Sequence, residues 1–189
     1  MERLASLFGS PARLKMIRLF VFNSETSFSL GEIVERTKLS REAARREVLD
    51  LLACDLLRKK GERADAQYQI NPHYEHLAAL NEFIRETTTV NSRKILEVLK
   101  RAGTLKLVAL SGHFTGILEP QVDLLVVGDN LDEKMLARAI HALEAEFGRE
   151  IRYASFVTPD FRYRLGVYDR LLRDVFDYPH RLLIDKIGL

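Results

Sequence analysis

The sequence predicts a two-domain protein of mixed class, α+β or α/β, in which three helices and a two-stranded hairpin precede a small α/β unit with a mixed sheet. Two observations support this prediction. Up to residue 54 the apolar residues recur at helical spacing between short polar turns, whereas from Leu105 onward strand patterns alternate with helical ones. A length of 189 residues suits two small domains. We expect a first domain at 1–72, a helical connector at 73–101 and a second domain at 102–189.

Serines mark the helix starts of the first domain. Ser10 precedes Pro11, and Ser29 and Ser40 each precede a helical pattern, so each serine can cap free N–H groups of a first turn. The predicted elements are helices at 11–22, 30–37 and 41–54, followed by strands at 56–60 and 67–71.

The connector and the second domain are predicted from the change in apolar period. Gly148 follows a long helical pattern and is expected to end it. The predicted helices lie at 73–87, 91–101 and 132–147, with a further helical region at 158–176. The predicted strands lie at 105–110, 122–127, 150–157 and 181–185.

Composition predicts an ordinary cytoplasmic protein without a membrane partner. No apolar run approaches the roughly 20 residues of a membrane-spanning helix. The single cysteine, Cys54, sits in an apolar helical run and is expected to be a buried structural thiol. The net charge is only +2, but residues 36–63 hold nine basic and five acidic residues, a local excess of +4. A basic patch of this kind favours binding to nucleic acid.

The third predicted helix has one apolar and one basic face. Ala44, Val48 and Leu51 form an apolar seam, and arginines at 41, 45 and 46 point away from it. A helix that docks one face on the protein can present the other to a DNA groove. The alternatives are that these arginines are solvated charges with helical pairs such as Glu42–Arg46, or that the domain binds another protein.

Residues 4–72 resemble the winged-helix transcription regulators of the ArsR and MarR type. The matching parts are Leu7–Arg13, the two helices of the helix-turn-helix, and the basic strand Leu56–Gly61. The resemblance implies that the second of these helices enters the major groove of double-stranded DNA, that the hairpin follows the backbone, and that a homodimer binds a palindromic operator. The residues it assigns to DNA contacts are Ser40, Arg41, Arg45, Arg46, Arg58, Lys59, Lys60 and Arg63.

The second domain resembles the minimal nucleotidyltransferase domains. The resemblance rests on Val108–Gly116, Val122–Asp129 and Tyr153–Leu165. Active members carry a Gly-Ser pair after the first strand and two aspartates, one residue apart, at the start of the second. Such carboxylates hold the divalent ions that bridge nucleotide phosphates.

This chain departs from the active pattern. The pair is reversed as Ser111-Gly112, and Gln121 takes the first aspartate position, so only Asp123 remains. We therefore expect a degenerate domain and assign no catalytic residue and no metal ligand; Mg²⁺ and a nucleoside triphosphate would be cofactors only if the site were active. A surviving pocket for a small-molecule or nucleotide effector would be lined by Ser111, Gly112, Gly116 and Asp123. Alternatively, these are turn residues and Asp123 pairs locally.

The function expected from the sequence is that of a sequence-specific DNA-binding transcriptional regulator whose nucleotidyltransferase-like domain acts as a sensor or assembly module. One alternative is an active nucleotidyltransferase that modifies a protein or RNA. Another is a protein-interaction module of the toxin–antitoxin type.

Overall fold

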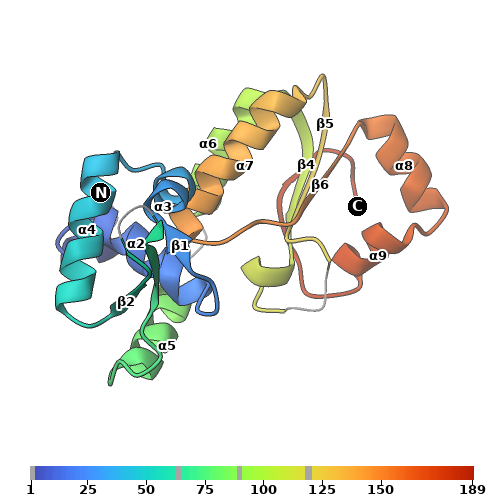
Figure 1. Cartoon of the computed structure of the whole chain (residues 1–189). Coiled ribbons are helices and arrows are strands. Elements are labelled where there is room, and N and C mark those ends of the chain that lie inside the picture. Colours follow the sequence, from blue (N-terminus) through green and yellow to red (C-terminus); the bar gives the residue numbers. More distant parts are fainter. Residues whose placement is uncertain (1–2, 63–64, 89–90, 118–120) are drawn as a thin grey trace. The chain divides into compact units, whose positions relative to one another are not determined.

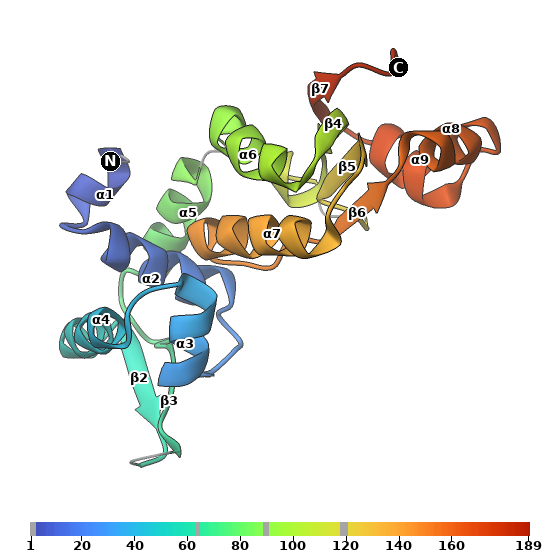
Figure 2. The same cartoon turned by 90° about the horizontal axis from the view of Figure 1, so that it is seen from above.

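The computed structural model describes residues 3–62, 65–88, 91–117 and 121–189, which form two compact units (Figures 1 and 2). Unit 1 comprises Met1–Thr89 and His141–Arg149, and unit 2 comprises Val90–Ile140 and Glu150–Leu189. The described residues hold nine α-helices and two small sheets, one of them mixed, which confirms the mixed α/β class. None of the described helices is long and apolar enough to span a membrane.

Unit 1 is a helical cluster with a small antiparallel sheet. The sheet order is β1-β3-β2, and Arg58 of β2 lies opposite Gln69 of β3. The elements are α1 (Arg3–Leu7), α2 (Pro11–Phe22), β1 (Phe28–Ser29), α3 (Leu30–Thr37), α4 (Arg41–Ala53), β2 (Leu57–Lys60), β3 (Gln67–Ile70) and α5 (Leu77–Thr87). Phe20, Ile33, Val48 and Ile70 lie in its buried core.

All three predicted serine caps are confirmed. Ser10 accepts a hydrogen bond from the backbone N–H of Arg13, and Ser40 accepts one from that of Ala43. Ser29 forms a full capping box, because Glu32 also accepts from the Ser29 backbone. These bonds fix where α2, α3 and α4 begin.

A buried carboxylate holds α4 on α2. Glu47 is 3% exposed, and its two oxygens accept hydrogen bonds from Ser10 Oγ at 3.0 Å and from Arg13 Nε at 2.8 Å. Arg13 also pairs with Asp50, one turn further along α4. A buried charge requires such partners, because desolvation without them is costly.

The C-terminal half of α7 (Glu133–Phe147) belongs to unit 1 through contacts with α2. The guanidinium of Arg18, 3% exposed, donates to the carbonyl of Glu146 at 3.1 Å. The Asn23 amide donates to the carbonyl of Gly148 at 2.7 Å, and Lys15 pairs with Glu146 at 2.8 Å. Gly148 ends the helix as predicted, with a φ of +76°.

Unit 2 is built on a mixed four-stranded sheet in the order β6-β5-β4-β7. Only β5 and β6 pair in parallel. The elements are α6 (Ser92–Leu99), β4 (Thr104–Leu110), β5 (Leu124–Asp129), residues 133–140 of α7, β6 (Tyr153–Phe156), α8 (Thr158–Gly166), α9 (Arg170–Phe176) and β7 (Arg181–Asp185), with short 3-10 turns η2 (Lys100–Ala102) and η3 (Gly112–Phe114). Helices α8 and α9 cover one face of the sheet, where Phe161 packs with Leu107 and Val127. Helix α6 and the adjoining half of α7 cover the other face.

Several predicted boundaries were wrong for local reasons. Helix α5 begins at Leu77, because turns after Asn71 occupy residues 72–76. The second strand begins at Leu124, two residues late, and the third is confined to Tyr153–Phe156. The region 158–176 divides into α8 and α9 at Tyr168, whose φ is +54°. Helix α1 and strand β1 were not predicted, and α5 and α6 fall in different units.

The expectation for Cys54 was also wrong, because this residue is exposed. Helix α4 ends at Ala53, so Cys54 lies at the cap rather than on the buried seam.

Replacement of Gly148 tests the close approach between α7 and α2. A Cβ at this position would lie 2.5 Å from the Arg18 carbonyl carbon, whereas one at Gly9, also at positive φ, would meet nothing within 4 Å. We expect Gly148→Ala to lower the free energy of unfolding by about 3 kcal/mol, from backbone strain and overpacking together, and Gly9→Ala by about 1 kcal/mol. Urea unfolding followed by circular dichroism measures both, and equal losses would contradict the predicted contact.

Candidate functional site

The exposed face of α4 carries three arginines. Arg41, Arg45 and Arg46 are exposed, while the buried side of the helix carries Ala44, Glu47, Val48 and Leu51. Within the described residues none of the three arginines forms an ion pair, and the helical pair between Glu42 and Arg46 is not formed. The Ser40 hydroxyl accepts the cap hydrogen bond and keeps its own proton for donation. This face is therefore available to a partner and strongly basic.

The β2–β3 hairpin projects from the helices of unit 1 beside α3 and α4 (Figure 2). On one face of it, two cations share a single neutral acceptor. Lys60 Nζ donates to Gln69 Oε1 at 2.9 Å, and an Arg58 Nη donates to the same oxygen at 3.3 Å. Within the part of the chain that the structure describes, neither cation pairs with a carboxylate, and Arg58 Nε is buried without a hydrogen bond.

Gln69 is fixed as the acceptor of these cations. Its side chain is 8% exposed, and its amide nitrogen donates to the Ser24 carbonyl at 3.1 Å. The Ser27 hydroxyl donates to the same Gln69 oxygen at 3.4 Å. A neutral amide leaves both positive charges uncompensated, so this face is suited to an anion such as phosphate.

The basic residues predicted for the hairpin do not all share one face. Because side chains alternate along a strand, exposed Lys59 lies on the opposite face of β2 from Arg58 and Lys60. Arg63 lies outside the described residues. The structure thus groups Arg58 and Lys60 and separates Lys59 from them.

Sequence reasoning missed Gln69 and Glu47. Glu47 carried a signal, since it lies three residues after Ala44 and four before Leu51, on the apolar seam. Gln69 carried none, because its role depends on the register that places it opposite Arg58.

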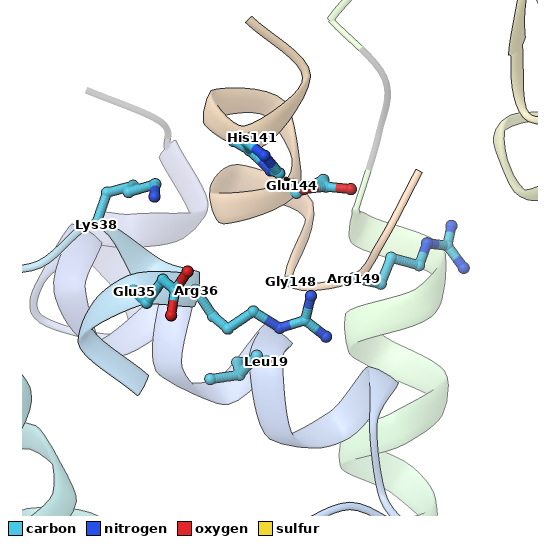
Figure 3. A pocket seen from close by; sticks show the side chains of 8 residues that line it. All are labelled: Leu19, Glu35, Arg36, Lys38, His141, Glu144, Gly148 and Arg149. Atoms are coloured by element: carbon cyan, nitrogen blue, oxygen red, sulfur yellow. Dashed lines mark hydrogen bonds and ion pairs between the residues drawn. The ribbon is translucent and has the colours of Figure 1, made fainter. Parts of the chain in front are cut away.

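Unit 1 also contains a hollow between α2, α3 and residues 141–149 (Figure 3). Its lining mixes charges: Glu35, Arg36 and Lys38 come from α3 and its C-cap, and Glu144 of α7 contacts His141 Nδ1 at 2.8 Å. The Arg149 side chain points away from the centre, with its guanidinium 4.8 Å from the centre of the Phe22 ring. Mixed charge gives no preference for one class of ligand, and we assign none.

In unit 2 the turn after β4 closes on Asp123. This carboxylate is 1% exposed and accepts four hydrogen bonds, from the backbone N–H groups of His113 (2.8 Å) and Arg152 (3.0 Å) and from the Arg152 guanidinium at 2.9 and 2.8 Å. Buried Ser111 donates to the carbonyl of Val122. Gly112, at φ +52°, has no room for a side chain, because a Cβ would lie 2.2 Å from Asp123 Oδ1.

Ser111, Gly112 and Asp123 therefore come together, but Gly116 does not join them. Gly116 is exposed, and a Cβ there would meet nothing within 4 Å. Gln121 is exposed as well, and its backbone N–H donates to Asp174 of α9 at 3.3 Å.

The charge of Asp123 is neutralised by Arg152. Burial by itself raises the pKa of Asp123, but the Arg152 guanidinium and the two backbone donors outweigh it and hold this pKa below its ordinary value. The same pair raises the pKa of Arg152. A guanidinium bound through two nitrogens takes the oxygen lone pairs that a divalent ion would need. Among the described residues, no group of three or more His, Cys, Asp and Glu side chains is placed to hold a metal ion.

No family model, curated protein or solved structure matches the chain. The assignment of both sites therefore depends on their geometry and charge.

Removal of the guanidinium tests the Asp123–Arg152 pair. We expect Arg152→Met to lower the free energy of unfolding at pH 7 by about 2 kcal/mol, less than for a fully buried pair because Arg152 is 39% exposed. The exposed pair of Arg173 with Asp177 supplies the control, and Arg173→Met should cost under about 0.5 kcal/mol.

The pH dependence has a defined sign. The lowered pKa of Asp123 contributes stability above its unfolded pKa of about 3.9, and this stability is lost as the pH falls through the folded value. In Arg152→Met the guanidinium no longer lowers the pKa of Asp123, so less stability should be lost between pH 7 and pH 3 than in the wild type. Urea unfolding between pH 3 and pH 7 measures the change; identical profiles for wild type and variant would contradict the pairing.

Proposed function

We propose that this protein is a cytoplasmic, sequence-specific DNA-binding transcription regulator, with a winged helix in unit 1 and a degenerate nucleotidyltransferase-like domain in unit 2. The observation that carries the proposal is the unpaired arginine face of α4, opposite a buried face anchored to α2. A recognition helix needs this division, with one face docked and the other free to enter the major groove.

The roles of the two basic elements follow from their chemistry. Arg41, Arg45 and Arg46 can bind guanine edges or phosphates through two nitrogens, which gives α4 the means of reading sequence. Arg58 and Lys60, held on neutral Gln69, supply phosphate contacts that set the register on the duplex. Two-fold symmetry of the operator would require a homodimer.

Unit 2 serves this function as a sensor or assembly module and not as a catalyst. The Asp123–Arg152 pair supports this, because Arg152 neutralises the one carboxylate that remains at the aspartate positions of active members of the resembled family. Helix α7 supplies residues to both units, which offers a covalent route from unit 2 to the helices of unit 1.

Substitution on α4 tests the proposal directly. We expect Arg45→Ala/Arg46→Ala to weaken binding to DNA from upstream of the protein's own gene by about 30-fold or more, because each of the two lost arginine contacts is worth about 1–3 kcal/mol. Fluorescence anisotropy against scrambled DNA at several salt concentrations measures affinity and preference. The control is Arg93→Ala/Arg101→Ala, which removes two exposed arginines from unit 2. Weak, equally salt-sensitive binding to both DNAs would refute a specific regulator.

A charge placed at Gln69, the neutral acceptor in the hairpin, tests the role of Arg58 and Lys60 separately. We expect Gln69→Glu to pair with Arg58 and Lys60, to keep the fold, and to weaken duplex binding about tenfold at low salt with a shallower salt dependence. In Gln69→Met the new side chain has nearly the same size as glutamine but carries no charge, so duplex affinity should fall much less than in Gln69→Glu. Equal losses in the two variants would show that packing, and not charge, decides the effect.

A further inference from the structure

The most exposed aromatic residues lie together in the sequence of unit 2. Tyr168 is 81% exposed and Tyr163 is 70% exposed, whereas the next most exposed aromatic residue, Tyr153, is 41% exposed. Tyr163 lies on α8, and Tyr168 lies in the link between α8 and α9. Large exposed apolar side chains that lie close together mark interaction sites more often than single scattered ones do.

The backbone at Tyr168 is held in a conformation that its side chain disfavours. Its φ is +54°, in the left-handed region where glycine or asparagine is usual just after a helix. Two backbone hydrogen bonds fix the turn. The N–H of Tyr168 donates to the carbonyl of Leu165, and the N–H of Asp169 donates to the carbonyl of Arg164. Strain of this kind in a bulky residue concentrates at ligand-binding sites.

Beside Tyr168 lies a hollow of about 360 Å³ between α8 and α9. Its surface is mainly apolar, with Leu165, Leu172 and Phe176 joining Tyr168, and the charged groups in the lining are Asp169, Arg173 and Asp177. The combination of an apolar floor with a few polar groups suits a flat ring that carries hydrogen-bonding edges.

The charged side chains of α8 and α9 that lack an ion-pair partner are mainly positive. Three carboxylates are in ion pairs, Asp160 and Asp169 with Arg164 and Asp177 with Arg173, whereas Asp174 accepts only the backbone N–H of Gln121 at 3.3 Å. In contrast, Arg162, Arg170 and Arg181 are exposed, and among the described residues none has a carboxylate partner.

We propose that α8, α9 and their link bind single-stranded nucleic acid. Bases stack on Tyr163 and Tyr168, one base enters the hollow, and Arg162 and Arg170 bind phosphates. Stacking on aromatic side chains combined with arginine contacts to the backbone is the physical basis of single-strand binding. A duplex does not offer its base faces in this way.

A second copy of the chain fits the same surface less well. A two-fold interface brings identical surfaces together, so it needs free charges of both signs. Here three of the four carboxylates are held in ion pairs within the unit, and most of the unpaired charged groups are arginines. The proposal does not depend on duplex binding by unit 1.

Anisotropy with labelled, unstructured dT and rU dodecamers tests the proposal on the full chain. Tyr168→Gly removes the ring and relieves the positive φ, so its fold is retained, and we expect binding to weaken about fivefold or more. Tyr168→Phe keeps the ring and should retain affinity. Arg162→Gln/Arg170→Gln should lower both affinity and salt dependence, whereas Arg93→Gln, at an exposed arginine of α6, should change little.

Three results would overturn the proposal: no binding of either dodecamer by the wild type, equal losses in Tyr168→Gly and Tyr168→Phe, or an unchanged affinity in Arg162→Gln/Arg170→Gln. A shift from dimer to monomer in Tyr168→Gly by light scattering, without single-strand binding, would assign the surface to a second copy. Duplex binding by the Arg45→Ala/Arg46→Ala variant is measured in parallel. The two proposals therefore fail separately, since one is read on duplexes with α4 variants and the other on single strands with α8–α9 variants.

Discussion

The buried Glu47 carboxylate is the constraint on which the basic surface of unit 1 depends. Its partners, Ser10 and Arg13, both lie at the start of α2, so α4 cannot rotate about its axis without burying an unpaired charge. Apolar contacts at Ala44 and Val48 favour the same orientation but would tolerate small rotations, because hydrophobic contact is not directional. The fixed orientation is what leaves the arginines of α4 exposed.

The two units treat charge in opposite ways. In unit 1 the cations at Arg58 and Lys60 meet only the neutral oxygen of Gln69, so their attraction for anions is preserved. In unit 2 the carboxylate of Asp123 accepts hydrogen bonds from Arg152 and from backbone N–H groups, so its charge is neutralised within the fold and does not attract an external cation. This contrast depends on two side chains, Gln69 and Arg152, that no sequence motif singled out.

The end of α7 joins the two halves of the sequence. Arg18 of α2 and Asn23, the C-cap of α2, donate hydrogen bonds to the carbonyls of Glu146 and Gly148 at the C-terminal end of α7. This end of the helix dipole is negative, so N–H donors are favourable there. Gly148 permits the approach, because any side chain there would collide with the backbone of Arg18. Residues 141–149 therefore complete unit 1 although they follow most of unit 2 in the chain.

The sequence by itself determined the mixed class, most helices and the basic face of α4. Serine caps and helical periodicity are local signals, since each cap bond spans only three residues, from Ser10 to Arg13, Ser29 to Glu32 and Ser40 to Ala43. The tertiary structure alone decided the partners of Glu47, Gln69 and Asp123, the grouping of residues 141–149 with unit 1 and the exposure of Cys54. Asp123 and Arg152 are 29 residues apart, and Arg13 and Glu47 are 34 apart. Such pairs depend on strand register and helix packing, which residue spacing along one chain does not specify.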